Sequence, residues 1–189
     1  MFDIVSFIPR AVMQGIPLMF GCVGETITEK SGNLNLGTAG VMYVGGICGV
    51  IGAFLYENSG AQMSTFLTIA IPLLCCILGS ALMGLLYCFL TVTLRANQNV
   101  TGLAMTTFGI GVGNFFGGSL NKLAGGVGQV SVAVTSQAFR NYSYSLVNFF
   151  DGFTGRLRLG TLLFSYGFLT YVALILAVAI WFFLTKTRT

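Results

Sequence analysis

The sequence is poor in charge and has no histidine. Only 7% of its 189 residues are charged, whereas a soluble domain carries about 25%. So few charged groups cannot cover a water-soluble globule, and most of the surface must therefore face lipid. Without histidine, the commonest zinc ligand and the commonest general base at neutral pH are both missing. The sequence also has no serine-nucleophile elbow and no P-loop, so we expect no enzyme activity, catalytic residue, metal or cofactor.

Cysteines and basic residues are present but form no recognisable site. The five cysteines all lie in apolar stretches, their number is odd and no C-x-x-C spacing occurs. This pattern favours small packing residues over disulfides or metal ligands. The net charge of +4 is spread thinly along the chain. We therefore expect no nucleic-acid partner.

The few charges leave long uncharged stretches between them. A transmembrane helix needs about 20 apolar residues to cross about 30 Å of hydrocarbon. Four stretches exceed that length, with 26, 37, 26 and 27 uncharged residues: Ser31–Tyr56, the residues between Glu57 and Arg95, Ala96–Asn121 and Leu159–Thr185. A fifth, Ala11–Gly24, is shorter, and Arg10 can extend it by snorkelling.

These stretches predict an all-α fold, a polytopic transmembrane helix bundle with about five spans in a single domain of residues 1–189. The expected spans are Val5–Val23, Leu36–Leu55, Phe66–Leu90, Val100–Phe116 and Gly160–Leu184. Pro72 lies one or two turns inside the third span. A polar broken-helix segment precedes the second span, and a long loop, Gly117–Arg158, precedes the fifth. Within this loop, alternating valine and polar residues at 125–137 predict a short strand or an extended segment.

The second and fourth spans are rich in glycine at helical spacing. The glycines are Gly45, Gly49 and Gly52 in the second span, and Gly109, Gly113 and Gly117 in the fourth. Helices in lipid associate through close backbone approach, which small residues permit. We therefore expect these two helices to lie inside the bundle.

A polar stretch, Gly24–Gly40, precedes the second span and contains Asn33, Asn35 and Thr38. Polar groups beside a span are tolerated where a helix is broken around a cavity, and transporters use such breaks to meet a polar solute. The three residues are therefore candidate solute contacts, whereas Glu25 at the start of the stretch is interpreted as part of a charged interfacial turn. The alternative is that they cap the second span at the water interface.

A second polar stretch, Arg95–Gly118, adds Asn99, Thr101 and Asn114 as candidate solute contacts. Their neutral hydrogen-bonding groups suit an uncharged, hydroxyl-rich solute better than an ion. The alternative is that Thr106 and Thr107 bond to their own helix while Asn114 holds a neighbouring one.

The same two stretches resemble signatures of a known family. The segment GETITEKSGNLNLGTAGVMYVGG is similar to the opening of permeases in bacterial ABC importers of nucleosides and simple sugars, and RANQNVTGLAMTTFGIG is similar to their second signature. The wider superfamily includes ribose and branched-chain amino-acid permeases. The resemblance implies a multi-pass permease in the cell membrane, working with ABC ATPase subunits, a second permease subunit and an extracellular solute-binding lipoprotein.

The resemblance also implies an orientation and a length. The C-terminus, Arg95 and Gly24–Ser31 would be cytoplasmic, and the Gly117–Arg158 loop external. Charge alone does not fix this orientation, because the basic residues divide almost evenly between the two sides. Such permeases are longer, so we expect the domain to be incomplete at its C-terminus.

Two other functions stay open at this stage. A branched-chain amino-acid permease would need half-helix termini or charges near its cavity to recognise a zwitterion. A non-transporting membrane scaffold would enclose Asn33 and Asn114 in a dry bundle. An ion-coupled transporter is disfavoured, because the spans contain neither a carboxylate nor a histidine.

Overall fold

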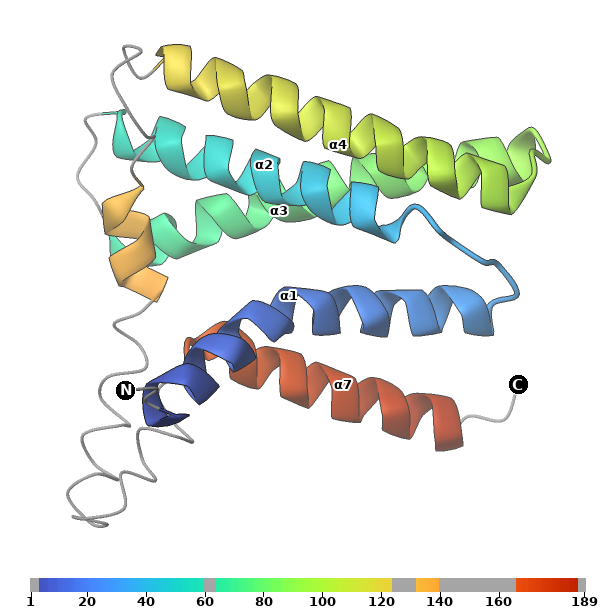
Figure 1. The fold of residues 1–189 in the computed structure, drawn as a ribbon, viewed down its shortest axis with the longest axis horizontal. Helices are drawn as coiled ribbons and strands as arrows, with labels where there is room; N and C mark the ends of the chain where they lie inside the picture. Colours follow the sequence, from blue (N-terminus) through green and yellow to red (C-terminus); the bar gives the residue numbers. More distant parts are fainter. Residues whose placement is uncertain (1–3, 60–63, 124–131, 140–165, 187–189) are drawn as a thin grey trace. The chain divides into compact units, whose positions relative to one another are not determined.

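A computed structural model describes residues 4–59, 64–123, 132–139 and 166–186. All regular structure in these ranges is helical, which confirms the expected all-α fold (Figure 1). The helices are α1 (Ile4–Lys30), α2 (Thr38–Glu57), α3 (Thr65–Cys88), a π-helical turn η1 (Phe89–Thr93), α4 (Gln98–Leu123), a short helix over residues 133–139, and α7 (Phe168–Lys186).

Three helices in the described ranges are long and apolar enough to cross a membrane: α2, α3 together with η1, and α7. The continuous helix of α3 and η1, Thr65–Thr93, has 29 residues. Pro72 lies inside α3, two turns from its start as expected. Polar residues at the end of α1 and throughout α4 dilute their apolar character. The expected number of five spans stays a prediction.

The helices differ from the expected spans at their ends. α1 continues through Glu25 to Lys30, so half of the expected polar segment is helical, because Glu and Lys are good helix formers. Gly32, with φ of 87°, ends the helix. Its N–H donates to the Glu29 carbonyl and the Asn33 N–H to the Thr28 carbonyl, which is the Schellman pattern of a glycine-ended helix.

The expected long loop is also partly helical. α4 runs on to Leu123, and residues 133–139 form a helix where a strand or an extended segment was expected. The Glu57 carboxylate accepts hydrogen bonds from the Thr135 N–H (2.8 Å) and hydroxyl (2.7 Å), which satisfies a donor in the first turn of this helix. The remainder of the expected loop, 124–131 and 140–158, lies outside the described residues, as do residues 160–165 of the expected fifth span.

The chain forms two compact units, one of residues Glu25–Ser136 and one that combines Met1–Gly24 with Gln137–Thr189. Within the first of these units, α2 lies between α3 and α4 and packs against both (Figure 1). The polar stretches that were singled out in the sequence both belong to this unit.

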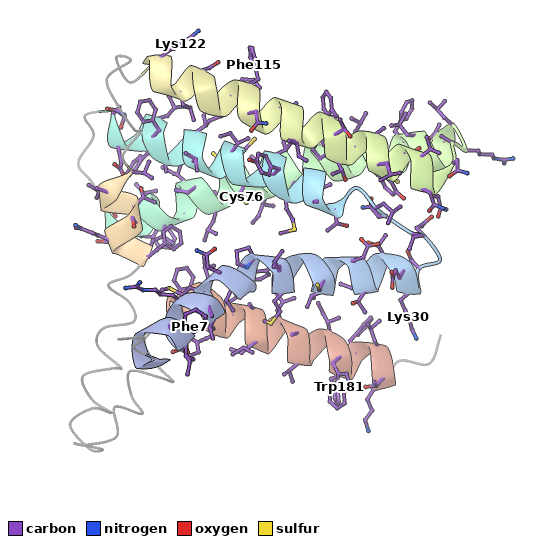
Figure 2. All side chains as sticks on the ribbon, in the orientation of Figure 1. Phe7, Lys30, Cys76, Phe115, Lys122 and Trp181 are labelled. Carbon is purple, nitrogen blue, oxygen red and sulfur yellow. The ribbon has the colours of Figure 1, made fainter. Side chains whose placement is uncertain are left out.

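Glycines bring α2 and α4 into backbone contact. Gly40 of α2 faces the backbone of Met105 on α4, and a Cβ atom built on Gly109 of α4 would lie 2.5 Å from the Gly40 carbonyl oxygen. The ring of Tyr43 covers Gly113 in the same way. Within this unit α2 packs against both α3 and α4, as expected of a helix inside the bundle; the same position for α4 stays a prediction. Phe115 of α4 is exposed and points outward (Figure 2).

Cysteines and glycines interlock where α2 meets α3. Three glycines face a cysteine of the other helix: Gly49 faces Cys76, Gly52 faces Cys75, and Gly79 faces Cys48. Figure 2 labels Cys76 on α3. Three of the five cysteines thus pack as small side chains, as expected, and the helices come close without a bulky layer between them.

Replacing Gly52 with alanine is expected to destabilise the protein by about 1–3 kcal/mol, the usual cost of overpacking. The new Cβ atom would lie 2.7 Å from the Cys75 sulfur. The matched control is Gly46→Ala on the same helix, where no atom lies within 4 Å, and where alanine is expected to be neutral or slightly stabilising. Thermal unfolding in detergent measures both. Equal midpoints would contradict the interlocked packing.

Candidate functional site

The break between α1 and α2 is the most polar structure in the described bundle. It comprises residues Ser31–Gly37, called here the connecting segment, and contains no regular helix. An irregular backbone carries N–H and C=O groups that are costly in lipid if they have no partner. The hydrogen bonds of this segment therefore decide where it can lie.

Side chains from α3 and α4 take up the backbone groups of the connecting segment. The Leu34 N–H donates to Oε1 of Gln98 (3.1 Å), and the Leu34 carbonyl accepts from the Tyr87 hydroxyl (2.9 Å). The Leu36 carbonyl accepts from the Thr106 hydroxyl (2.8 Å). These partners are 53 to 70 residues away in sequence. The segment is therefore held by tertiary contacts and not by local turn geometry alone.

The carboxylate of Glu25 on α1 binds the end of the connecting segment that leads into α2. The Asn35 N–H donates to Oε1 of Glu25 (3.0 Å), and the Thr38 hydroxyl donates to the other carboxylate oxygen. The Asn35 side-chain oxygen accepts from the Gly37 N–H (2.8 Å). Glu25, which is half-buried, thereby joins α1 to the first residue of α2.

The connecting segment runs inward along α4. Its outer end contacts Gln98, in the first turn of α4, and its inner end contacts Thr106. Eight residues of helix correspond to about 12 Å along the axis. Gly102, between these two partners, has no side chain, and a Cβ atom there would lie 2.8 Å from the Leu36 nitrogen. α2 therefore begins inside the bundle, beside a point on α4 that lies about two helical turns after the start of that helix.

A tight turn places Gln98 at the first turn of α4. After the π-helical turn η1, Arg95 adopts a φ of 51°, which is uncommon for a residue with a side chain. The side-chain oxygen of Asn97 then accepts from the N–H groups of Asn99 (3.0 Å) and Val100 (3.3 Å). This N-cap begins α4 at the level of the connecting segment.

The structure brings three of the predicted solute contacts together in and next to the connecting segment. Asn33 accepts a hydrogen bond from Nε2 of Gln98 (2.8 Å), while Asn35 and Thr38 share Glu25. All three side chains are half-buried. The side-chain oxygens of all three residues form hydrogen bonds within the protein. The amide nitrogens of Asn33 and Asn35 make no hydrogen bond with the described residues.

The other three predicted contacts lie elsewhere in the same unit. Asn99 is exposed on the first turn of α4. Thr101 is buried and lines a pocket of about 330 Å³ with Leu86 and Phe108. Asn114 lines an open groove of about 500 Å³ between α2 and α4, with Tyr43 on one side. The six residues thus occupy three places and do not form one cavity.

The threonines of α4 divide between the two interpretations given for them. The Thr107 hydroxyl bonds to the Leu103 carbonyl of its own helix (3.1 Å), as the structural alternative predicts. Thr106 bonds instead to the connecting segment. The Asn114 amide makes no hydrogen bond with the described part of the chain, so it does not hold a neighbouring helix there.

Four residues of the site were not among the predicted contacts: Glu25, Tyr87, Gln98 and Thr106. Gln98 and Thr106 lie in the second polar stretch, Arg95–Gly118, so the sequence marked the region that contains them. It did not indicate which residues they bind. Glu25 had the appearance of a charged interfacial residue, and Tyr87 lies inside an apolar run. Among the described residues, no group of acidic or cysteine side chains could hold a metal ion.

The apolar helices and the side-chain-supported break define a helical membrane protein. Residues 7–189 match the family described as the permease component of the branched-chain amino acid transport system. The chain therefore belongs to this permease family, and the resemblance noted in the sequence is confirmed. No solved structure matches the chain.

Two relatives refine the comparison. The putative glucose ABC transporter permease protein TsgC13 of Haloferax volcanii is 28% identical over 172 residues, which are 90% of this chain and 45% of that protein. The guanosine ABC transporter permease protein NupQ of Bacillus subtilis is 25% identical over 104 residues, 55% of this chain and 31% of that protein. The chain thus spans less than half the length of either relative.

Proposed function

We propose that this chain forms the translocation path of an ATP-driven ABC importer for a nucleoside or a simple sugar. It would act as a permease subunit in the cell membrane with about five spans, paired with a second permease subunit, two ATPases and an extracellular binding lipoprotein. One observation carries the proposal: the two stretches that resemble the family signatures contact each other through the hydrogen bond between Asn33 and Gln98. The similarity to a putative glucose permease and to a guanosine permease supports it.

The polar groups at this site suit an uncharged solute. Amides and hydroxyls surround the connecting segment, and the groove beside α4 offers the Asn114 amide next to the Tyr43 ring. Its volume of about 500 Å³ falls within the usual range for small-molecule sites, roughly 300–1,000 Å³. We propose that the solute meets the polar residues of both stretches as it passes: Asn33, Asn35, Thr38, Asn99, Thr101 and Asn114.

The description of the matching family favours a second candidate, import of branched-chain amino acids. The two candidates are separated by uptake of radiolabelled guanosine, glucose and leucine into cells that produce this chain within its complete transporter. We expect uptake of guanosine or glucose and none of leucine. Uptake of leucine alone would replace the proposal with the amino-acid function, and uptake of none of the three would refute it.

Replacing Asn114 with leucine is expected to raise the apparent KM of uptake about tenfold, the effect of losing one or two hydrogen bonds to the solute. Membrane insertion should not change, because the Asn114 side chain is exposed. The control is Ser119→Ala on the same helix, since the Ser119 hydroxyl bonds to the Phe115 carbonyl of its own helix (2.9 Å). An unchanged KM in Asn114→Leu would remove this residue from the path.

A further inference from the structure

The N-terminus of α2 lies inside the bundle and has no cap from its own sequence. Its N-cap residue is Gly37, which offers no side chain, and the first helical hydrogen bond runs from the Val41 N–H to the Gly37 carbonyl (3.0 Å). The N–H groups of the first helical turn therefore have no intrahelical acceptor, and the helix end carries a partial positive charge. An anion placed here would be stabilised.

The chain supplies that anion itself. Both carboxylate oxygens of Glu25 accept hydrogen bonds, one from the Asn35 N–H and one from the Thr38 hydroxyl, on the two sides of this helix start. The Thr38 hydroxyl also lies 3.0 Å from the Asn35 carbonyl oxygen. A glutamate carboxylate carries a negative charge and accepts hydrogen bonds. No basic side chain among the described residues forms an ion pair with Glu25. Its charge therefore lies beside the positive end of the α2 dipole.

A helix N-terminus that already holds a carboxylate distinguishes anionic solutes from uncharged ones. Transporters with broken helices use half-helix N-termini to hold anionic groups of a substrate. Here an incoming carboxylate or phosphate would meet a helix end that already holds the negative charge of Glu25. Such repulsion disfavours a wrong partner strongly. An uncharged solute with hydroxyl groups meets no such repulsion.

We propose that Glu25 determines specificity: by occupying the N-terminus of α2 it excludes solutes that carry a carboxylate or a phosphate from the translocation path. This inference rests on the proposed transport function and narrows it to uncharged solutes. Glu25 acts through the electrostatic potential at the helix end and through its hold on Asn35 and Thr38.

The test compares solutes that differ in one anionic group. Uptake of glucose is measured against glucuronate, and uptake of guanosine against guanosine 5′-monophosphate, in cells that produce the complete transporter. Glu25→Gln removes the charge but keeps the shape, and the Thr38 hydroxyl can turn to accept from the new amide. We expect this variant to raise the ratio of anionic to neutral uptake by about tenfold or more. The matched control is Glu29→Gln, because Glu29 is exposed one turn further along α1, and its ratio should not change.

A second variant separates charge from folding. Glu25→Asp keeps the charge with a shorter side chain, so we expect slower uptake but the same exclusion of anions; size-exclusion chromatography verifies that each variant is folded. An unchanged ratio in Glu25→Gln, or lost exclusion in Glu25→Asp, would overturn the role of Glu25 while leaving the transport function in place. If the unmodified protein imports glucuronate as well as it imports glucose, or guanosine 5′-monophosphate as well as it imports guanosine, the role is overturned as well. If the unmodified protein imports neither neutral solute, the proposed function itself fails.

Discussion

Replacing Gly109 with leucine is expected to force α2 and α4 apart and to prevent stable folding of the bundle. Even the first carbon of the new side chain would lie 2.5 Å from the carbonyl oxygen of Gly40 and 2.6 Å from its Cα atom. A backbone atom of a helix cannot turn away as a flexible side chain can, so the helix itself has to move. We expect a destabilisation of about 3 kcal/mol or more, the upper end of the usual cost of overpacking.

The matched control is Gly111→Leu, two residues further along α4, where no atom lies within 4 Å. Both variants add the same side chain to the same helix, so they differ only in the face that receives it. Size-exclusion chromatography and thermal unfolding in detergent should show a folded Gly111→Leu protein and an aggregated or unfolded Gly109→Leu protein. Similar behaviour of the two would show that α2 and α4 do not meet at Gly109.

Replacing Gln98 with leucine is expected to release the outer end of the connecting segment. The Gln98 side chain accepts from the Leu34 N–H and donates to the Asn33 side chain, and leucine can do neither. A polar group left without a partner away from water costs about 1–3 kcal/mol. With two such groups affected, we expect a loss of roughly 2–5 kcal/mol in unfolding free energy. Uptake should fall in parallel.

The control for this change is Gln14→Leu, because Gln14 is exposed on α1 and has no hydrogen bond with the described residues. A double-mutant cycle with Asn33→Leu isolates the amide pair. We expect Asn33→Leu to cost much less in the Gln98→Leu background than in the unmodified protein. If the two costs simply add, Gln98 and Asn33 do not interact and the connecting segment is held in another way.

The contacts between helices were largely predictable because they follow from spacing along one helix. Gly109 and Gly113 are four residues apart, so they share a face in any α-helix, and the structure shows that this face packs closely against α2. The same local argument predicted Pro72 within a helix and the polar break before α2. These properties depend on residue types at fixed intervals, and no knowledge of a distant partner is needed.

The site was less predictable because its bonds join residues far apart in sequence. Nothing local to Gln98 reveals that its amide meets Asn33, 65 residues earlier. Glu25 looked like an interfacial charge because its partners, Asn35 and Thr38, become neighbours only after α1 continues to Lys30 and the chain turns back at Gly32. The early end assigned to α1 therefore also concealed the role of Glu25.

The distant partners of the connecting segment impose an order on the biogenesis of the protein. When a ribosome has made α1 and α2, the backbone of Leu34 and Leu36 still lacks Tyr87, Gln98 and Thr106, which follow 53 to 70 residues later. At about 5–20 residues per second, this interval lasts roughly 3–14 seconds. During that time α2 and the segment before it cannot enter lipid without exposing polar backbone groups. We therefore expect the insertion machinery to retain them in a hydrated site until α4 has emerged.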